Sequence, residues 1–237
     1  MVNVSGVPAL VDGAPAGATY AELHAAFIAS TREDIAASLL HLATALRAGR
    51  YPAGRPYRHV NGFTKIVMAE HPSARLTLHF WPAAPDTPDD VSRPHDHRFA
   101  FSSILLGGRQ HFTELDVTDD PDAEPWRCFE YRPYVQGRIA TVTARGRVGL
   151  IPVRTVEREP LDGYYRTSST VVHQAITNRD QPCVTLVLRG PRERRTSKVY
   201  YRPSEPPPRG GLQFGRHLDH DEVVRQVDQA VALVTTM

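Results

Sequence analysis

The sequence has few cysteines and no long apolar segment. Its 237 residues include two cysteines, Cys128 and Cys183, which excludes the disulfide framework of a small secreted domain. No window approaches the roughly 18 consecutive apolar residues that a transmembrane helix requires. The N-terminus has neither the basic start nor the apolar run of a signal peptide. We therefore expect a cytoplasmic protein with free thiols and no membrane partner.

Lysine is also scarce. Lys65 and Lys198 are the two lysines among 28 basic residues, and the others are arginines. Together with the many alanines and prolines, this usage is typical of a GC-rich bacterial genome. The net charge is only +2, so the composition does not call for nucleic acid as a partner, and we expect none.

Helical patterns lie at both ends of the chain. Thr19 followed by Glu22 is a capping-box pattern, and Thr31 can cap a second helix. Ile35, Leu39, Leu42 and Leu46 recur at helical spacing, and Gly49 ends the pattern. This predicts one or two helices over residues 19–48. Near the C-terminus, Asp219 is placed to cap a helix whose valines form one apolar stripe.

The region between the helices reads as a series of short strands. From Tyr57 onward, alternating runs such as "ARLTLHFWP" and "CVTLVLRG" are separated by turns rich in Gly, Pro and Asp, which is typical of a β-sandwich or barrel. We expect an N-terminal arm with helices (1–50), a β-barrel domain (51–203), and a Pro-rich connection with a C-terminal helix packed on the barrel (204–237).

Three histidines form the candidate metal site. His95 and His97, in "RPHDHRFAFSSILLGG", are one residue apart and would point to the same side of a strand. A third ligand must come from elsewhere, and His173 in "TSSTVVHQAITN" is the best candidate because a polar ring facing a barrel interior requires a partner. The alternative is an accidental His-x-His at the beginning of an ordinary strand. Neutral imidazole suits Fe, Zn, Cu and Ni.

These segments resemble the cupin superfamily. Its first motif reads G-x5-H-x-H-x3-4-E-x6-G, and its second carries a His shortly before an Asn; "PHDHRFAFSSILLGG" and "VVHQAITN" match them. The chain also resembles a poorly characterised bacterial subgroup through "NGFTKIV" and "TLVLRGP". The resemblance covers roughly residues 57 to 200. It implies a mainly β protein, the double-stranded β-helix or jelly-roll barrel, with the helices outside it. It does not imply one activity, because cupins host many chemistries.

The chain departs from the cupin pattern at the glutamate of the first motif. That residue should fall near position 102, where Ser102 and Ser103 stand. Some cupins, the thiol dioxygenases among them, use three histidines and no glutamate. The resemblance therefore implies a three-histidine site of His95, His97 and His173, with Glu114 on the next strand as the alternative fourth ligand.

Several other residues are candidates near the site. Tyr165 shares strand parity with His173 and could act as an acid or base, or it could be a rim tyrosine with its hydroxyl in water. Arg109 and Arg189 are candidates to clamp a substrate carboxylate. Arg75 and His79 share a face that could reach the cavity, although we expect it to be partly solvated. The basic turn "GPRERR" is expected to be solvated as well.

The leading functional hypothesis is a non-haem metal enzyme. We expect Fe(II), with Zn, Ni, Mn or Cu as alternatives, and a dioxygenase or oxygenase reaction of a small polar metabolite with O2. The alternatives are a redox-neutral metal-dependent isomerase, lyase or cyclase, and a non-catalytic cupin that binds a small molecule. Cupins are often dimers, so the resemblance allows a homodimer.

Overall fold

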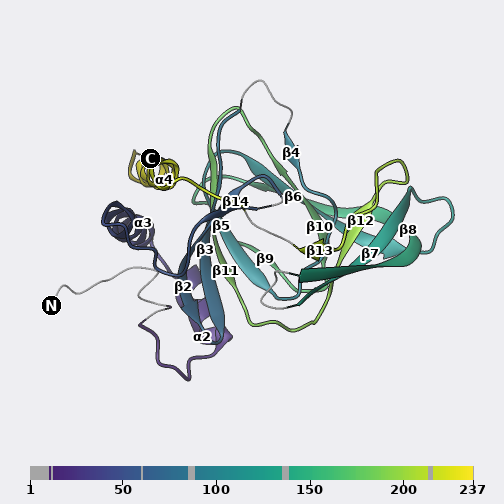
Figure 1. Cartoon of the computed structure of the whole chain (residues 1–237), viewed down its shortest axis with the longest axis horizontal. Helices are drawn as coiled ribbons and strands as arrows, with labels where there is room; N and C mark the ends of the chain where they lie inside the picture. The colour runs from purple at the N-terminus through teal and green to yellow at the C-terminus, as the bar shows by residue number, and fades with distance from the viewer. Residues whose placement is uncertain are drawn as a thin grey trace.

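The structure is a computed structural model, and it describes residues 11, 13–59, 61–84, 89–134, 139–212 and 216–236. In this part of the chain, two antiparallel β-sheets form a barrel, and helices cover the outside of one sheet (Figure 1). The predicted mainly β jelly-roll barrel, with N-terminal helices and a C-terminal helix, is confirmed.

The strands that pair are often far apart in the sequence, as in a jelly roll. Across the first sheet the order is β14 (Arg216–His217), β1 (Tyr57–Arg58), β2 (Thr64–His71), β3 (Ala74–Trp81), β11 (Cys183–Arg189), β5 (Phe101–Gly107) and β9 (Tyr165–Thr167). Across the second sheet it is β12 (Ser197–Tyr201), β7 (Pro125–Tyr134), β8 (Ile139–Arg158), β6 (Gln110–Thr118), β10 (Val172–Thr177) and β4 (Asp90–Val91). A further strand, β13 (Gly211–Leu212), pairs with β8.

The helices begin where the sequence predicts. Thr19 and Thr31 form complete capping boxes for α2 (Tyr20–Ile28) and α3 (Arg32–Arg47), so the predicted helical region consists of two helices. The C-terminal helix α4 (His220–Thr236) has the Asp219 carboxylate at its beginning, where it accepts hydrogen bonds from backbone N–H groups of the first turn.

The main core lies between the first sheet and the helices. Leu76, Leu78 and Leu186 point outward from the sheet and pack with residues of α3 and α4 such as Leu39 and Val227, all of them fully buried. Figure 1 shows α3 and α4 side by side on this side of the sheet. Burying each such side chain stabilises the fold by about 2 kcal/mol. This core includes residues of the N-terminal helices, the barrel and the C-terminal helix. The boundaries expected between these three parts stay a prediction.

The other face of the first sheet is the inside of the barrel. Because side chains alternate along a strand, the neighbours of these outward-facing leucines point toward the second sheet. Thr77, Val187, Ser103 and Tyr165 form one cross-strand row on this inner face. The predicted site residues lie around this interior.

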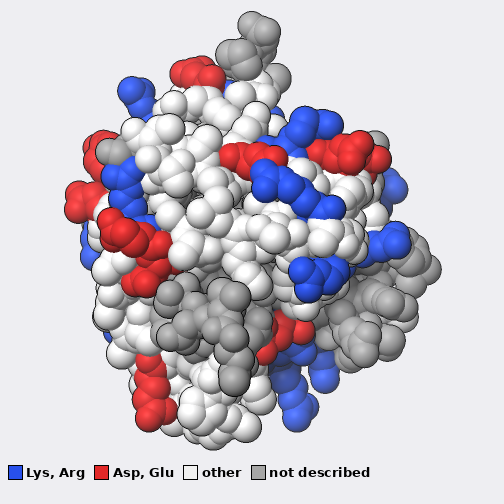
Figure 2. All heavy atoms as spheres, turned by 90° about the vertical axis from the view of Figure 1, so that its left-hand side faces the viewer, with Lys and Arg blue, Asp and Glu red and all other residues white. Residues whose placement is uncertain are grey.

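The surface over α3 and α4 carries both charge signs. Figure 2 shows acidic and basic side chains interspersed over this face, and one ion pair joins Arg47 of α3 to Asp228 of α4 at 2.6 Å. In the part of this face that the structure describes, charges of one sign do not gather in a large patch. A search of the described helices finds none with the length and apolar character to cross a membrane.

Candidate metal centre

The structure brings the three predicted ligands together. His95 and His173 face each other as an antiparallel bridge, and the backbone N–H of each donates to the carbonyl of the other at 3.0 Å. The ring nitrogens of His95, His97 and His173 lie within 4.8 Å of one another, and Nε2 of His97 is 3.3 Å from Nε2 of His173. Among the described residues, these three form the group whose ligand atoms could hold one metal ion.

The spacing of His97 and His173 fits a shared metal ion. Two imidazole nitrogens that bind one ion at about 2.1 Å are about 3.0 Å apart in octahedral geometry and about 3.4 Å apart in tetrahedral geometry, which brackets the His97–His173 distance. Nδ1 of His95 is 2.7 Å from the Arg93 carbonyl oxygen. A carbonyl can only accept, so Nδ1 carries the proton and Nε2 keeps its lone pair for a metal.

The electrostatics of the site also favour metal binding. Burial lowers the pKa of all three histidines, and those of His97 and His173 fall well below the usual range. The charge that His95 would carry lowers the other two pKa values further. The rings are therefore neutral at pH 7, and neutral imidazole is the form that binds Fe(II), Zn, Ni and Cu.

The segment that carries the first two histidines is held by an ion pair whose carboxylate is buried. Asp96, which is 4% exposed, accepts hydrogen bonds from the Lys198 backbone N–H and from Arg194 at 2.8 Å. Arg194 also donates to the Ser169 carbonyl at 2.9 Å, and thereby links two segments beside the histidines. The expectation that the "GPRERR" turn is solvated is wrong for Arg194. Its guanidinium is held against Asp96 and the Ser169 carbonyl, which come near it only when the chain folds.

An aromatic side chain stands where the cupin motif places a carboxylate. Ser102 points away from the site, and its hydroxyl contacts Nε2 of His24 in α2 at 2.6 Å. Phe101, one residue earlier, faces the site, with its ring centroid 5.0 Å from that of His97. The sequence predicted no carboxylate in this region and named Ser102 and Ser103; strand alternation turns Phe101 and Ser103 inward and Ser102 outward.

Glu114 stands directly opposite His173 in the pairing of β6 with β10. Its carboxylate forms an ion pair with Arg154 at 3.3 Å, and it is outside the group of ligand atoms that the three histidines form in the described chain. A role for Glu114 as fourth ligand stays a prediction.

Tyr165 lies inside the barrel. Its side chain is 3% exposed, its ring stacks on Phe112 at 4.1 Å, and its centroid is 6.2 Å from that of His173. The alternative of a rim tyrosine with its hydroxyl in water is therefore wrong. Burial raises the pKa of Tyr165, and the neighbouring Glu114 carboxylate raises it further, so the phenol stays protonated at neutral pH.

Basic residues line the wall opposite the histidines. Arg75 and His79 are on the inner face of β3, which agrees with the alternative that they reach the cavity, while Arg75 stays one-third exposed, as a partly solvated face would be. Arg189 is on the same wall, whereas Arg109 is exposed at the end of β5 that lies away from Phe101. Sequence reasoning missed Lys65, although it alternates with the core residue Ile66 along β2 and so points inward.

The strand order and the positions of both histidine motifs agree with the predicted resemblance. The barrel has the cupin fold. No family model and no curated protein matches the sequence.

Several solved structures match part of this cupin fold. A structure of DMSP lyases matches with a TM-score of 0.32 and 17% identity, over 54% of this chain and 47% of that chain. A cupin superfamily protein from Desulfitobacterium hafniense matches with a TM-score of 0.32 and 9% identity, over 56% of this chain and 81% of that chain. Hydroquinone 1,2-dioxygenase from Sphingomonas sp. TTNP3 with 4-hydroxybenzoate bound matches with a TM-score of 0.32 and 11% identity, over 59% of this chain and 69% of that chain. This chain thus spans about half the length of the DMSP lyase chain, and at these values no activity follows.

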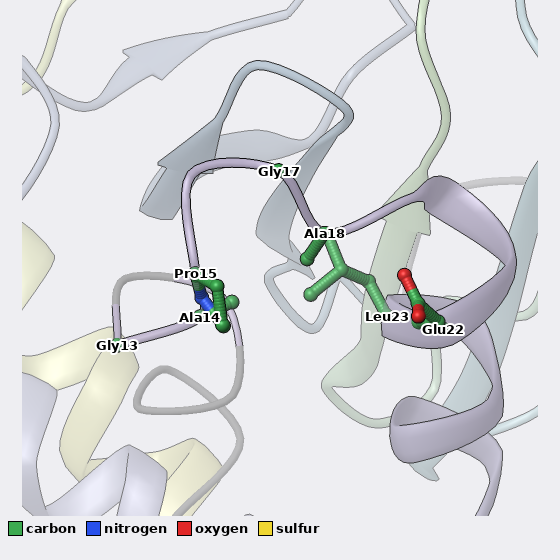
Figure 3. A pocket seen from close by; sticks show the side chains of 7 residues that line it. All are labelled: Gly13, Ala14, Pro15, Gly17, Ala18, Glu22 and Leu23. Carbon is green, nitrogen blue, oxygen red and sulfur yellow. The ribbon is translucent and has the colours of Figure 1, made fainter.

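A cavity of about 530 Å³ lies away from the barrel interior, between the N-terminal arm and α2 (Figure 3). The one charged residue in its lining is Glu22, whose carboxylate is already engaged by Thr19 in the capping box. The remaining lining is Leu23 and small residues of the arm, so this cavity offers no group for chemistry.

Proposed function

We propose that this cupin is a metal-dependent enzyme, most consistent with a non-haem Fe(II) oxygenase that acts on a small polar metabolite. The observation that supports this is the cluster of three neutral imidazoles, one buried and two half-buried, in which the ring nitrogens of His97 and His173 are at a spacing that fits one ion. Three neutral ligands leave a divalent ion its full charge and open coordination positions. When bound, Fe(II) would supply those positions and one-electron chemistry with O2.

The side chains around the histidines have separate roles in this proposal. Phe99, Phe101 and Phe112 border the rings of His97 and His173 and exclude water from the site. Tyr165, which keeps its phenolic proton, is placed to donate a hydrogen bond or a proton to a substrate oxygen beside His173.

The test of this proposal is the metal content of the protein purified without added metal. We expect about one equivalent of iron in the wild-type protein and a large loss in His173→Ala, because two ligands on one segment hold an ion poorly. His41→Ala, which changes an exposed histidine of α3, is the matched control and should keep the iron. Iron retained by His173→Ala would contradict the three-histidine site. Full iron loading without O2 uptake in the presence of any small thiol, amino acid or enol would contradict the oxygenase.

A redox-neutral lyase or isomerase is the second candidate, and the protonated, buried Tyr165 favours it as a general acid. Turnover under strictly anaerobic conditions, lost in Tyr165→Phe, would select this reaction over the oxygenase. A non-catalytic binding protein would show neither form of turnover while still binding its ligand.

A further inference from the structure

The inner face of the first sheet carries half-buried cations on three adjacent strands, β2, β3 and β11. Lys65 of β2 is paired with His79 of β3, and Arg75 of β3 is paired with Arg189 of β11. Arg189 is in turn paired with Phe101 of β5. Cross-strand partners share a face of the sheet, so these side chains all point into the barrel.

This wall adjoins the candidate metal centre directly. The guanidinium of Arg189 lies 4.9 Å from the ring centroid of Phe99, and that ring stacks on His97 with a centroid distance of 5.3 Å. The Lys65 ammonium lies close enough to Arg189 and Arg75 for their charges to lower its pKa. A small molecule held by Arg189 would therefore lie beside the ring that stacks on His97.

The positive charge of this wall is not balanced by the described acids. Glu70 forms an ion pair with Arg75 and is the acid whose charge also acts on Arg189. Within the described ranges, no ion pair joins Lys65 or Arg189 to a carboxylate. Burial and the neighbouring arginines lower the pKa of Lys65 to about 8, while burial, followed by the charges of Arg75 and other arginines, lowers that of Arg189 to about 10.

A cation that is partly withdrawn from water without a counter-ion, as Lys65 and Arg189 are, destabilises a protein unless an anion compensates it. A guanidinium binds a carboxylate through two parallel hydrogen bonds, and an ammonium adds a point charge beside it. There is room at the edge of this wall, where a cavity of about 400 Å³ is bordered by three arginines, Arg75, Arg189 and Arg192. One carboxylate, that of Glu70, also lines it and is paired with Arg75.

We propose that Lys65, Arg189 and Arg75 form a carboxylate-binding subsite next to the three histidines. The ligand is a small carboxylic acid whose carboxylate binds the basic wall while another of its polar groups reaches the histidines. That this ligand is the substrate rests on the function proposed above, whereas its binding to the wall does not.

Binding of malonate to the metal-free protein, in buffer without phosphate, tests the subsite. Isothermal titration calorimetry should detect malonate binding to the wild-type protein and at least tenfold weaker binding to Lys65→Met and to Arg189→Gln. Lys198→Met makes the same chemical change at the other lysine and should bind malonate as the wild type does. Malonamide has the same shape without charge and should not bind.

The Lys65→Met variant should also fold, because it removes a half-buried charge that forms no ion pair with a described carboxylate. Its unfolding temperature without malonate should equal or exceed that of the wild type. Equal malonate affinity in wild type and Lys65→Met, or no binding to the wild type, would overturn the subsite. Iron content is measured separately, so protein that loads iron but ignores malonate contradicts this inference and leaves the metal site standing.

Discussion

The guanidinium of Arg194 reaches both Asp96, which is between His95 and His97, and the carbonyl of Ser169. The backbone N–H of His97 donates to that same Ser169 carbonyl, so one arginine holds the segments on which the rings depend. Arg194 is itself partly exposed. It acts on the rings through Asp96 and Ser169, and it is therefore a positioning residue.

Replacing Arg194 with Met should affect stability and metal affinity together. The buried Asp96 carboxylate would lose its charge partner, which should lower the free energy of unfolding by about 3 kcal/mol. Loss of a group that orients the ligands should also weaken metal binding by about tenfold. Urea unfolding and zinc titration against a chelating dye measure the two effects. Arg195→Met, at an exposed neighbour, is the control; unchanged zinc affinity in Arg194→Met would restrict the ion pair to a purely structural role.

Strand β5 divides its side chains between two environments. Phe101 and Ser103 face the barrel interior, while Ser102 contacts His24 of α2 and Ile104 joins the core under the helices. The strand ends in a turn at Gly108, which has φ of 84°, a left-handed conformation that L side chains rarely adopt. A Cβ at Gly108 would lie 2.6 Å from the Cα of Cys183, so the neighbouring backbone also requires glycine.

Gly108→Ala should therefore lower the free energy of unfolding by more than the conformational strain alone. We expect a loss of about 3 kcal/mol, since backbone strain and a clash with main-chain atoms add together. Gly163→Ala is the matched control, because Gly163 has φ of 69° but open space around an added Cβ, and it should lose only about 1 kcal/mol. Chemical denaturation compares the two; equal losses would show that the close approach to Cys183 costs nothing.

At the scale of the whole molecule, the barrel encloses basic groups in a protein whose net charge is only +2. His59 stacks on Phe63, which in turn stacks on His79, with centroid distances of 4.5 and 4.3 Å. Burial lowers the pKa of His59 to about 3, and the nearby Lys65 charge acts in the same direction. The fold thus holds inner histidines neutral at a pH where the unfolded chain would protonate them.

This burial predicts that acid destabilises the metal-free protein. As the pH falls from 7.5 to 5.5, His59 takes up a proton near pH 6.5 in the unfolded state but not in the folded state, so the free energy of unfolding decreases. His59→Gln should reduce that decrease by about 1.4 kcal/mol. Urea unfolding at both pH values gives the comparison, with exposed His41→Gln as control. An unchanged pH dependence in His59→Gln would mean that this ring is accessible to protons in the folded protein.

The sequence by itself determined the local features of this protein. Capping boxes at Thr19 and Thr31 set the beginnings of two helices, because such caps depend on residues three apart. The spacing of His95 and His97 placed their rings on one side, and the barrel setting of His173 identified the third ring.

The tertiary structure decided the features that depend on distant partners. Closure of the barrel decided which face of each strand became its interior. It placed Phe101, and not Ser102, at the site, and it turned Lys65 and Arg189 inward. The contact of Arg194 with Asp96 joins residues 98 positions apart, so no local pattern could indicate it. Alternation along a strand is encoded locally, whereas the choice between inside and outside is made only when the sheets close on each other.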